Sequence, residues 1–87
     1  MSLTYQLTLS RESIKFLKKQ EKSVQVRIIK ALQGLTIQPP MGDIRPLKGR
    51  KRQLRLRVGT YRVIFEANHN ERVIYILTID NRGGIYK

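Results

Sequence analysis

Polar and apolar residues alternate along two short stretches that flank a Gly-Thr dipeptide near the middle of the chain. Residues 53–58 read QLRLRV and residues 61–66 read YRVIFE. Alternation with a period of two is typical of strands with one buried face, and a two-residue loop that begins with Gly favours a type II′ turn. The pattern therefore predicts a β-hairpin. Its register pairs six apolar residues on one face: Val58 with Tyr61, Leu56 with Val63 and Leu54 with Phe65.

The other face of the predicted hairpin is basic. The same register sets Arg57 opposite Arg62 and Arg55 opposite Ile64. Like charges on directly opposed residues, with Cβ atoms about 5 Å apart, destabilise a sheet. At an effective dielectric constant of ~20 the bare repulsion approaches ~3 kcal/mol before splaying and salt screening reduce it. Two interpretations stay open: the arginines splay into solvent, or an anionic ligand bridges both guanidinium groups and turns the cost into affinity.

The chain before the hairpin predicts one strand and two helices. Residues 3–9 alternate, with Leu3, Tyr5, Leu7 and Leu9 on the buried face. Ser10 suits an N-cap, and we expect a helix from Arg11 to about Lys19 with Ile14 and Leu17 facing inward. A second helix follows at residues 24–35, and Pro39 and Pro40 stop it. Its apolar face is expected to comprise Val24, Ile28, Ala31, Leu32 and Leu35, widened by Val26 and Ile29.

The remaining segments complete a two-layer fold. Residues 41–51 read as a loop, and residues 67–71 as a polar turn. Residues 72–79, RVIYILTI, are apolar on both faces, which is typical of an interior strand. In the tail DNRGGIYK, Gly83 and Gly84 permit a bend. We predict an α+β fold: an N-terminal strand, an αα-hairpin, then a three-stranded antiparallel meander, forming one sheet with helices on one face. The other sheet face then stays uncovered.

Composition narrows the partners of this fold. The 87 residues suit a single domain, 1–87, with 18 basic and 6 acidic residues and a net charge of +12. Such an imbalance favours a polyanionic partner, with nucleic acid first and an acidic protein second; no basic amphipathic segment favours a membrane. The chain has no Cys and one His, so we expect no metal site and no cofactor. A reducing, cytoplasmic location is expected, because neither a secretory signal nor a 20-residue apolar span is apparent.

Three motifs resemble those of the RelE/ParE superfamily of toxins from toxin–antitoxin systems. They are L-K-G at residues 47–49, R-x-G-x-Y-R at residues 57–62 and R-x-x-x-Y at residues 82–86. The order of elements is similar over nearly the whole chain. The resemblance implies a microbial-ribonuclease-like fold and, for the RelE branch, an endonuclease that cuts mRNA in the ribosomal A site. It also implies a cognate antitoxin that blocks the toxin and represses the operon together with it.

The resemblance also implies site residues. The family's basic pair before the G-x-Y-R turn falls on Gln53 and Arg55, and the family's later arginines and tyrosine fall on Arg62, Arg82 and Tyr86. Gln53 departs from the lysine that is commonest there, and Asn81 stands where related branches carry His. These departures concern proton transfer and leave the phosphate-binding arginines in place. Further RNA-binding residues are expected among the neighbouring basic positions: Lys48, Arg50, Lys51, Arg52 and Arg57.

The residue types themselves favour phosphate binding over proton transfer. Cleavage of RNA by its own 2′-OH needs a base, a cationic clamp on the phosphorane and an acid. Arginines supply the clamp, whereas His69 reads as a turn residue and Glu66 as a partner of Lys or Arg. Tyr86 needs neighbouring arginines to lower its pKa before it can act as a base. We therefore expect slow cleavage of free RNA and dependence on the ribosome to orient the scissile phosphate.

Two other functions stay open at this point. One is a ParE-like inhibitor of DNA gyrase, and the other is a basic RNA-binding module without catalysis, whose binding weakens steeply with salt. The expected partners are an acidic, RelB-like antitoxin, the ribosome and mRNA, with operator DNA contacted only through the antitoxin complex. Seven basic helix residues suit docking to ribosomal RNA or a plain solvated exterior: Arg11, Lys15, Lys18, Lys19, Lys22, Arg27 and Lys30.

Overall fold

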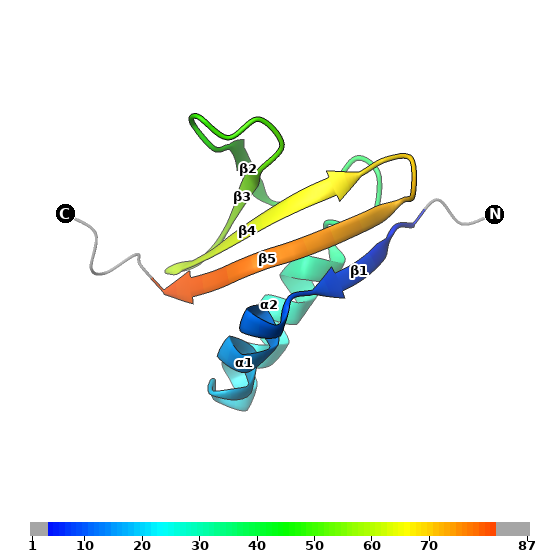
Figure 1. Ribbon diagram of the computed structural model, residues 1–87. Helices are drawn as coiled ribbons and strands as arrows, with labels where there is room; N and C mark the ends of the chain where they lie inside the picture. Colours follow the sequence, from blue (N-terminus) through cyan, green and yellow to red (C-terminus); the bar gives the residue numbers. More distant parts are fainter. Residues whose placement is uncertain (1–3, 82–87) are drawn as a thin grey trace.

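The protein folds as a five-stranded sheet with two helices against one of its faces (Figure 1). The computed structural model describes residues 4–81. The elements in chain order are β1 (Gln6–Leu9), α1 (Arg11–Lys18), α2 (Lys22–Gln33), β2 (Asp43–Pro46), β3 (Leu54–Val58), β4 (Tyr61–Asn68) and β5 (Val73–Asn81). The strand order is β1-β5-β4-β3-β2. The α+β class and the meander of β3, β4 and β5 are confirmed.

The predicted hairpin forms with the predicted register. Val58 pairs with Tyr61 and Arg57 with Arg62, and the remaining pairs follow in step. Gly59 has φ 62°, whereas Thr60 is not among the residues with positive φ. A type II′ turn requires this combination of φ angles, so the Gly-Thr loop agrees with the turn type predicted from the sequence.

Both helices pack on the apolar face of the sheet, α1 against β5 and β1 and α2 against β3, beneath the sheet in the view of Figure 1. Ser10 caps α1 by accepting a hydrogen bond from the Ser13 amide at 3.1 Å, as its residue type predicts. Leu17 of α1 enters the core, but Ile14 is 42% exposed, so the prediction that Ile14 faces inward is wrong. The position beside Leu17 in the core belongs to Ser13, which is fully buried under β5 and contacts the Ile76 carbonyl.

The buried face of α2 is narrower than its sequence suggests. Ile28 and Leu32 are fully buried, whereas Val26 and Ile29 are 51% and 41% exposed. The expected widening of the apolar face by these two residues is therefore wrong. A single small sheet can cover only one side of a helix, and Val26 and Ile29 lie on the side that no element of residues 4–81 covers.

A fifth strand lies inside the segment that was expected to be a loop. β2 pairs antiparallel with β3, which sets Asp43 opposite Arg57 and Arg45 opposite Arg55. Four residues that end in Pro carry too little pattern to identify a strand by themselves. Gly42, at φ 126°, precedes β2; a Cβ there would lie 2.6 Å from Leu56 Cδ1, so only Gly lets the chain approach β3 so closely.

A β-bulge in β5 changes which residues face the helices. Phe65 pairs with Ile76, but the preceding residue Ile64 pairs with Thr78, so Leu77 is an extra residue on β5. Buried residues on this strand accordingly change from a spacing of two to a spacing of three: Ile74, Ile76 and Ile79. The bulge places Asp80, instead of Ile79, opposite Arg62.

Candidate nucleic-acid interface

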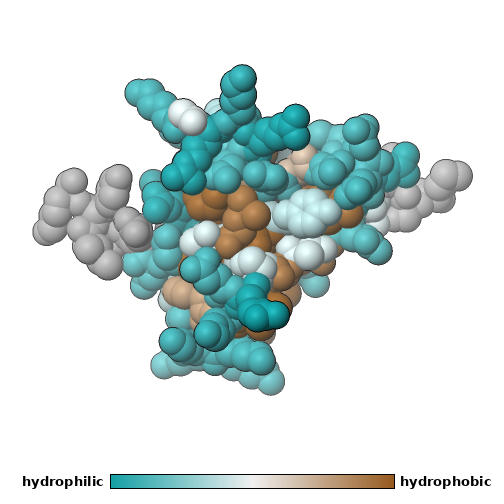
Figure 2. Space-filling view, in the orientation of Figure 1, coloured by the Kyte–Doolittle hydropathy of each residue, from teal (hydrophilic) through white to brown (hydrophobic). Residues whose placement is uncertain are grey.

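The face of the sheet that carries no helix has an apolar centre with charged borders. Ile64, Tyr75 and Leu77 are half-buried. Figure 2 shows hydrophobic and weakly polar residues gathered over the middle of β4 and β5, with hydrophilic residues around them. Because Leu56, Val63 and Phe65 point into the core, strand alternation puts the hairpin arginines on this open face. The expectation that one sheet face stays uncovered and carries Arg55, Arg57 and Arg62 holds for residues 4–81.

Four charged residues form one row across four strands of the open face. Asp43 on β2 pairs with Arg57 on β3, Arg57 pairs with Arg62 on β4, and Arg62 pairs with Asp80 on β5. The signs along the row are therefore negative, positive, positive, negative. The opposition of Arg57 and Arg62 is thus real, but an acidic residue stands on either side of it.

The aspartates approach the arginines without forming short hydrogen bonds. Asp43 Oδ1 lies 3.5 Å from Arg55 Nη2 and 3.8 Å from Arg45 Nε, and Asp80 Oδ2 lies 3.6 Å from Arg62 Nη2. Tight ion pairs between guanidinium and carboxylate groups have distances of about 2.7–2.9 Å. The chain itself therefore offsets part of the repulsion by electrostatic proximity. This compensation within the chain stands beside the two interpretations given above, splaying into solvent and a bridging anion, and it depends on β2 and on the bulge in β5.

Arg62 keeps donor capacity beyond its aspartate partner. Its Nε is buried and has no hydrogen-bond partner among residues 4–81. A buried donor without an acceptor costs roughly 1–3 kcal/mol. Arg55 is diagonal to Arg62 across the hairpin, within reach of a long side chain, and only 13% of its side chain is exposed. The two guanidinium groups can therefore converge on one tetrahedral anion through a change of rotamer.

The other expected RNA-binding residues lie on the loop between β2 and β3 and at its end. Lys48, Arg50, Lys51 and Arg52 are exposed. Gln53 is half-buried, and its Oε1 accepts a hydrogen bond from Arg50 at 3.1 Å. The loop that carries these residues joins β2 to the start of β3, at the end of the strand opposite to the hairpin turn (Figure 1). Arg82 and Tyr86 lie outside the described residues.

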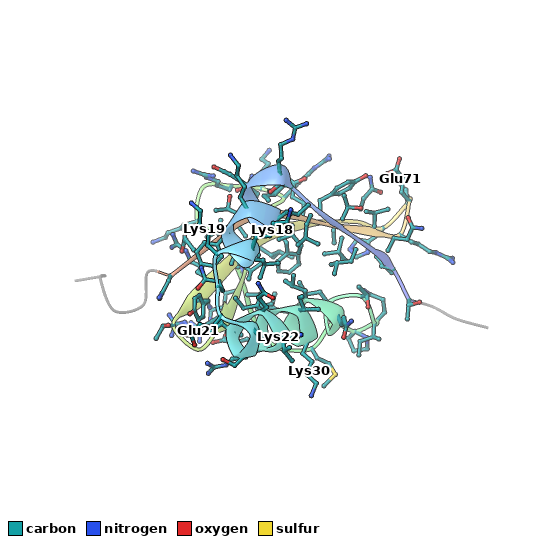
Figure 3. All side chains as sticks on the ribbon, turned by 90° about the horizontal axis from the view of Figure 1, so that it is seen from below. Lys18, Lys19, Glu21, Lys22, Lys30 and Glu71 are labelled. Atoms are coloured by element: carbon teal, nitrogen blue, oxygen red, sulfur yellow. The ribbon has the colours of Figure 1, made fainter. Side chains whose placement is uncertain are left out.

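The basic residues of the helices belong to a different surface. Figure 3 labels Lys18, Lys19, Lys22 and Lys30 on the outer side of the helices, turned away from the sheet. Arg27 differs from them, because its guanidinium lies so close to Gly59 that a Cβ on Gly59 would be 2.9 Å from Nη2. One helix arginine thus reaches the tip of the hairpin, next to the row of charges.

The surroundings of Glu66 and Tyr75 on the open face differ from what the sequence indicates. Glu66 was expected to pair with Lys or Arg, but it makes no ion pair or hydrogen bond within the part of the chain that the structure describes. Tyr75, which sequence analysis did not select, faces Glu66 across the β4–β5 ladder. Its hydroxyl donates to Glu71 Oε1 at 3.1 Å, and this hydrogen bond and the negative charge of Glu71 raise the pKa of the phenol.

His69 has a structural role at the end of the sheet. It lies in the turn between β4 and β5, as its surroundings predict, and its Nδ1 is 2.7 Å from the Tyr5 hydroxyl. The two rings also meet edge to face, with centroids 5.6 Å apart. This contact ties the start of β1 to the turn. In the described range 4–81 no group of three or more His, Asp or Glu residues is arranged to hold a metal, and neither helix is long and apolar enough to cross a membrane.

Comparisons with known proteins agree with this architecture. The family model described as the ParE toxin of the type II toxin–antitoxin system parDE matches residues 7–86. The archaeal RelE of the RelE–RelB complex from Pyrococcus horikoshii has 29% identity and a TM-score of 0.79, with 92% of this chain and 97% of that chain covered. The toxin of the RelB–RelE complex from Methanococcus jannaschii has 27% identity and a TM-score of 0.68, with coverage of 91% and 94%.

A more distant bacterial structure shares the fold. The isolated RelE toxin of E. coli has 16% identity and a TM-score of 0.74, with 88% of this chain and 83% of that chain covered. Comparison of the sequence with curated proteins gives no match. Because the family model spans almost the whole chain and the archaeal RelE toxins agree in structure over more than nine-tenths of it, the chain belongs to the ParE toxin family of type II toxin–antitoxin systems, within the RelE/ParE superfamily.

Proposed function

We propose that this toxin is a ribosome-dependent mRNA endonuclease of the RelE type. The observation that carries the proposal is the position of Arg55, Arg57 and Arg62 as neighbours on the helix-free face of the sheet. Guanidinium groups recognise phosphate oxygens in a bidentate geometry and keep their charge at any physiological pH. Similarity to archaeal RelE toxins at 27–29% identity supports the RelE branch.

The proposed chemistry is attack by the RNA 2′-OH on the adjacent phosphate. Arg55 and Arg62 would bind the non-bridging oxygens, where negative charge grows as the phosphorane forms. Asp43 and Asp80 would yield their positions near these guanidinium groups to the phosphate. Tyr86 would take the proton of the attacking 2′-OH and return a proton to the leaving 5′ oxygen, with Arg82 as an additional clamp residue, as the family motif implies.

The chemical groups on the open face explain why cleavage should depend on the ribosome. Within residues 4–81 the open face offers phosphate-binding groups, and Glu66 is a carboxylate on it without an arginine partner. Positioning of the reacting groups supplies roughly 7–11 kcal/mol in favourable cases. A ribosome that holds the mRNA codon rigidly would provide this positioning, so cleavage of free RNA should be slow.

Induction of the toxin in cells, followed by primer extension on a translated mRNA, tests the proposal. Wild-type toxin should produce breaks within codons, and Arg62→Ala should lower their yield by about two to three orders of magnitude, as loss of one charge-stabilising donor does elsewhere. Arg62→Lys should give an intermediate yield of breaks, because lysine keeps the positive charge but lacks the forked pair of N–H donors of the guanidinium group. Arg72→Ala removes one exposed charge from the β4–β5 turn, outside the basic residues assigned to RNA or the ribosome, and serves as the matched control. Equal cleavage by wild-type toxin and folded Arg62→Ala would contradict the assignment.

A gyrase inhibitor is the second candidate, since the matching family model is that of ParE. Pulse labels distinguish the two after induction: an mRNA endonuclease stops protein synthesis first, whereas a gyrase poison stops DNA synthesis and leaves translation running. A non-catalytic RNA-binding module would give neither breaks nor DNA damage.

The proposed partner of the toxin is a cognate acidic antitoxin. The archaeal and mycobacterial neighbours are toxins in complex with RelB-type antitoxins. This toxin offers two complementary surfaces. One is the group of hairpin arginines Arg55, Arg57 and Arg62, called the arginine row below, and the other comprises the exposed apolar residues Val26 and Ile29 of α2. Binding to operator DNA would occur only through the complex. A titration that detects no complex with the product of the adjacent reading frame would count against the proposal.

A further inference from the structure

A hollow of about 480 Å³ opens at the end of the sheet away from the hairpin turn, between the β2–β3 loop and the β4–β5 turn. Its walls include six residues that bear on nucleotide binding: Lys51, Arg52, Glu66, Asn68, His69 and Tyr75. Glu66 and Tyr75 face each other across the ladder, and Glu66 lies four residues along β4 from Arg62. At about 3.3 Å per residue this separation is ~13 Å. An RNA strand with a phosphate on the arginine row would reach the hollow within one or two nucleotides.

The walls of the hollow are held in place by contacts within the fold. Glu71 accepts a hydrogen bond from the Tyr75 hydroxyl at 3.1 Å, which holds the ring in place, and this hydrogen bond raises the pKa of the phenol above its ordinary value. Tyr5 anchors His69 at the rim through a 2.7 Å contact with Nδ1. Aromatic rings with one open face are the usual stacking platforms for unpaired RNA bases.

Glu66 is the feature of the hollow that the arginine row does not explain. It is a half-buried carboxylate on the same face as Arg55, Arg57 and Arg62, in a chain with 18 basic and 6 acidic residues. Lys51 and Arg52 share the same hollow, yet within residues 4–81 no cation comes close enough to pair with Glu66. A carboxylate that repels phosphate is unfavourable in a surface that only grips a backbone. A carboxylate suits a position where the bound ligand donates hydrogen bonds.

A carboxylate has two acceptor oxygens and selects a ligand with two adjacent donors. Among the RNA bases only guanine offers this pattern, with N1–H beside the N2 amino group on its Watson–Crick edge. Adenine and cytosine each offer one amino group, next to a ring acceptor that the carboxylate repels. In uracil the N3–H lies between two carbonyl groups, and the carboxylate repels both of them equally.

We propose that the hollow is a guanine-binding subsite, in which the base stacks on Tyr75, Glu66 accepts from N1–H and N2–H, and Lys51 and Arg52 contact the phosphate of the same nucleotide. The inference rests on the proposed function, because it assumes that the strand on the open face is RNA. It adds a base preference to a site whose arginines contact only the backbone.

Equilibrium binding of the four nucleoside 5′-monophosphates to the purified toxin tests the subsite. GMP should bind at least about tenfold more tightly than AMP, CMP or UMP, as expected for one bidentate pair. Glu66→Gln should reduce the four affinities to similar values, since an amide presents one acceptor only. Glu21→Gln makes the same change at the exposed N-cap of α2 and should keep the preference. Tyr75→Phe should keep binding, whereas Tyr75→Leu should weaken all four nucleotides roughly tenfold.

Backbone amide shifts in NMR spectra of the wild-type protein locate the bound nucleotide without any variant. GMP should shift Glu66, Ala67 and Tyr75 more than Arg62. Equal affinities for the four nucleotides, or a preference for GMP that survives Glu66→Gln, would overturn the subsite. In that case Arg62→Ala would still abolish mRNA cleavage if the proposed function is correct. If Arg62→Ala cleaves normally, the proposed function fails whatever the nucleotide preference.

Discussion

Asp43 offers the sharpest test of the charge row, because its removal should change stability and binding in opposite directions. Its carboxylate lies 3.5 Å from Arg55 Nη2 and 3.8 Å from Arg45 Nε, and its residue pairs with Arg57 across the β2–β3 ladder. Asp43→Asn keeps the size and shape of the side chain and removes the charge. Any difference in stability or RNA binding between Asp43→Asn and the wild-type protein therefore reports on electrostatics instead of packing.

The size of the expected stability loss follows from the distance between Asp43 and Arg55 and from the exposure of the Asp43 side chain. Two unit charges 3.5 Å apart attract by ~1 kcal/mol in bulk water and by ~5 kcal/mol at an effective dielectric constant of 20. The Asp43 side chain is 49% exposed, so the lower limit is the better guide, as it is for exposed ion pairs in general. We expect the free energy of unfolding to fall by about 1 kcal/mol, which for a chain of this size lowers Tm by roughly 4–8 °C.

Phosphate binding should improve by a comparable amount. In the wild-type protein a phosphate at Arg55 competes with Asp43 for the same guanidinium group, and in Asp43→Asn it does not. A gain of about 1 kcal/mol corresponds to a roughly fivefold lower Kd. Fluorescence anisotropy with a labelled 2′-O-methyl RNA, which lacks the attacking hydroxyl, measures binding without cleavage, and urea denaturation measures stability.

The matched control is Glu21→Gln, which makes the same change in net charge on the helix side. Both variants strengthen long-range attraction of RNA equally, so only the excess in Asp43→Asn reports on competition at Arg55. If RNA binding by Asp43→Asn stays at the level of the control while stability falls, the arginine row does not hold the phosphate. That outcome would refute the reasoning behind the proposed site.

Other predictions follow from single features of the fold. Gly59→Ala should lower the free energy of unfolding by about 1–2 kcal/mol in urea denaturation, because φ 62° is strained for Ala; unchanged stability would mean a different turn. Glu71→Gln should move the pKa of Tyr75 back toward its ordinary value of 10.0, seen as an earlier rise in tyrosinate absorbance, with Tyr75→Phe as the blank. Because the folded-state pKa is raised, the stabilisation by Glu71 is present below pH 10 and is lost as the pH rises further; a stability difference that persists there would contradict this hydrogen bond. Ile28→Ala should cost about 2–5 kcal/mol at a fully buried position, whereas Ile29→Ala, at a 41% exposed one, should cost far less; equal losses would contradict the orientation of α2.

Local patterns along the chain were sufficient for much of the fold. Alternation around Gly59 predicted the hairpin down to its register, because turn type and strand period together leave one pairing that puts Leu54, Leu56, Val58, Tyr61, Val63 and Phe65 on one face. Ser10 marks the start of α1 as predicted, whereas α2 ends at Gln33 with Gly34 as its C-cap, so the expectation that Pro39 and Pro40 stop this helix is wrong. Ile14, Val26 and Ile29 were assigned to the core in error. Helical periodicity gives the direction of an apolar face, but it does not show how much of that face a neighbouring element covers.

The candidate site was predicted only in part. The sequence by itself determined the fold class and the positions of Arg55, Arg57 and Arg62 on one face of a hairpin, since these depend on residues close together in the chain. Only the tertiary structure decided what surrounds those arginines. Asp43 reaches them because a short strand pairs with β3, and Asp80 faces Arg62 because one extra residue in β5 shifts the register. The Glu66 hollow likewise depends on two segments brought together by the sheet, and contacts between distant segments leave no period or spacing in the sequence to read.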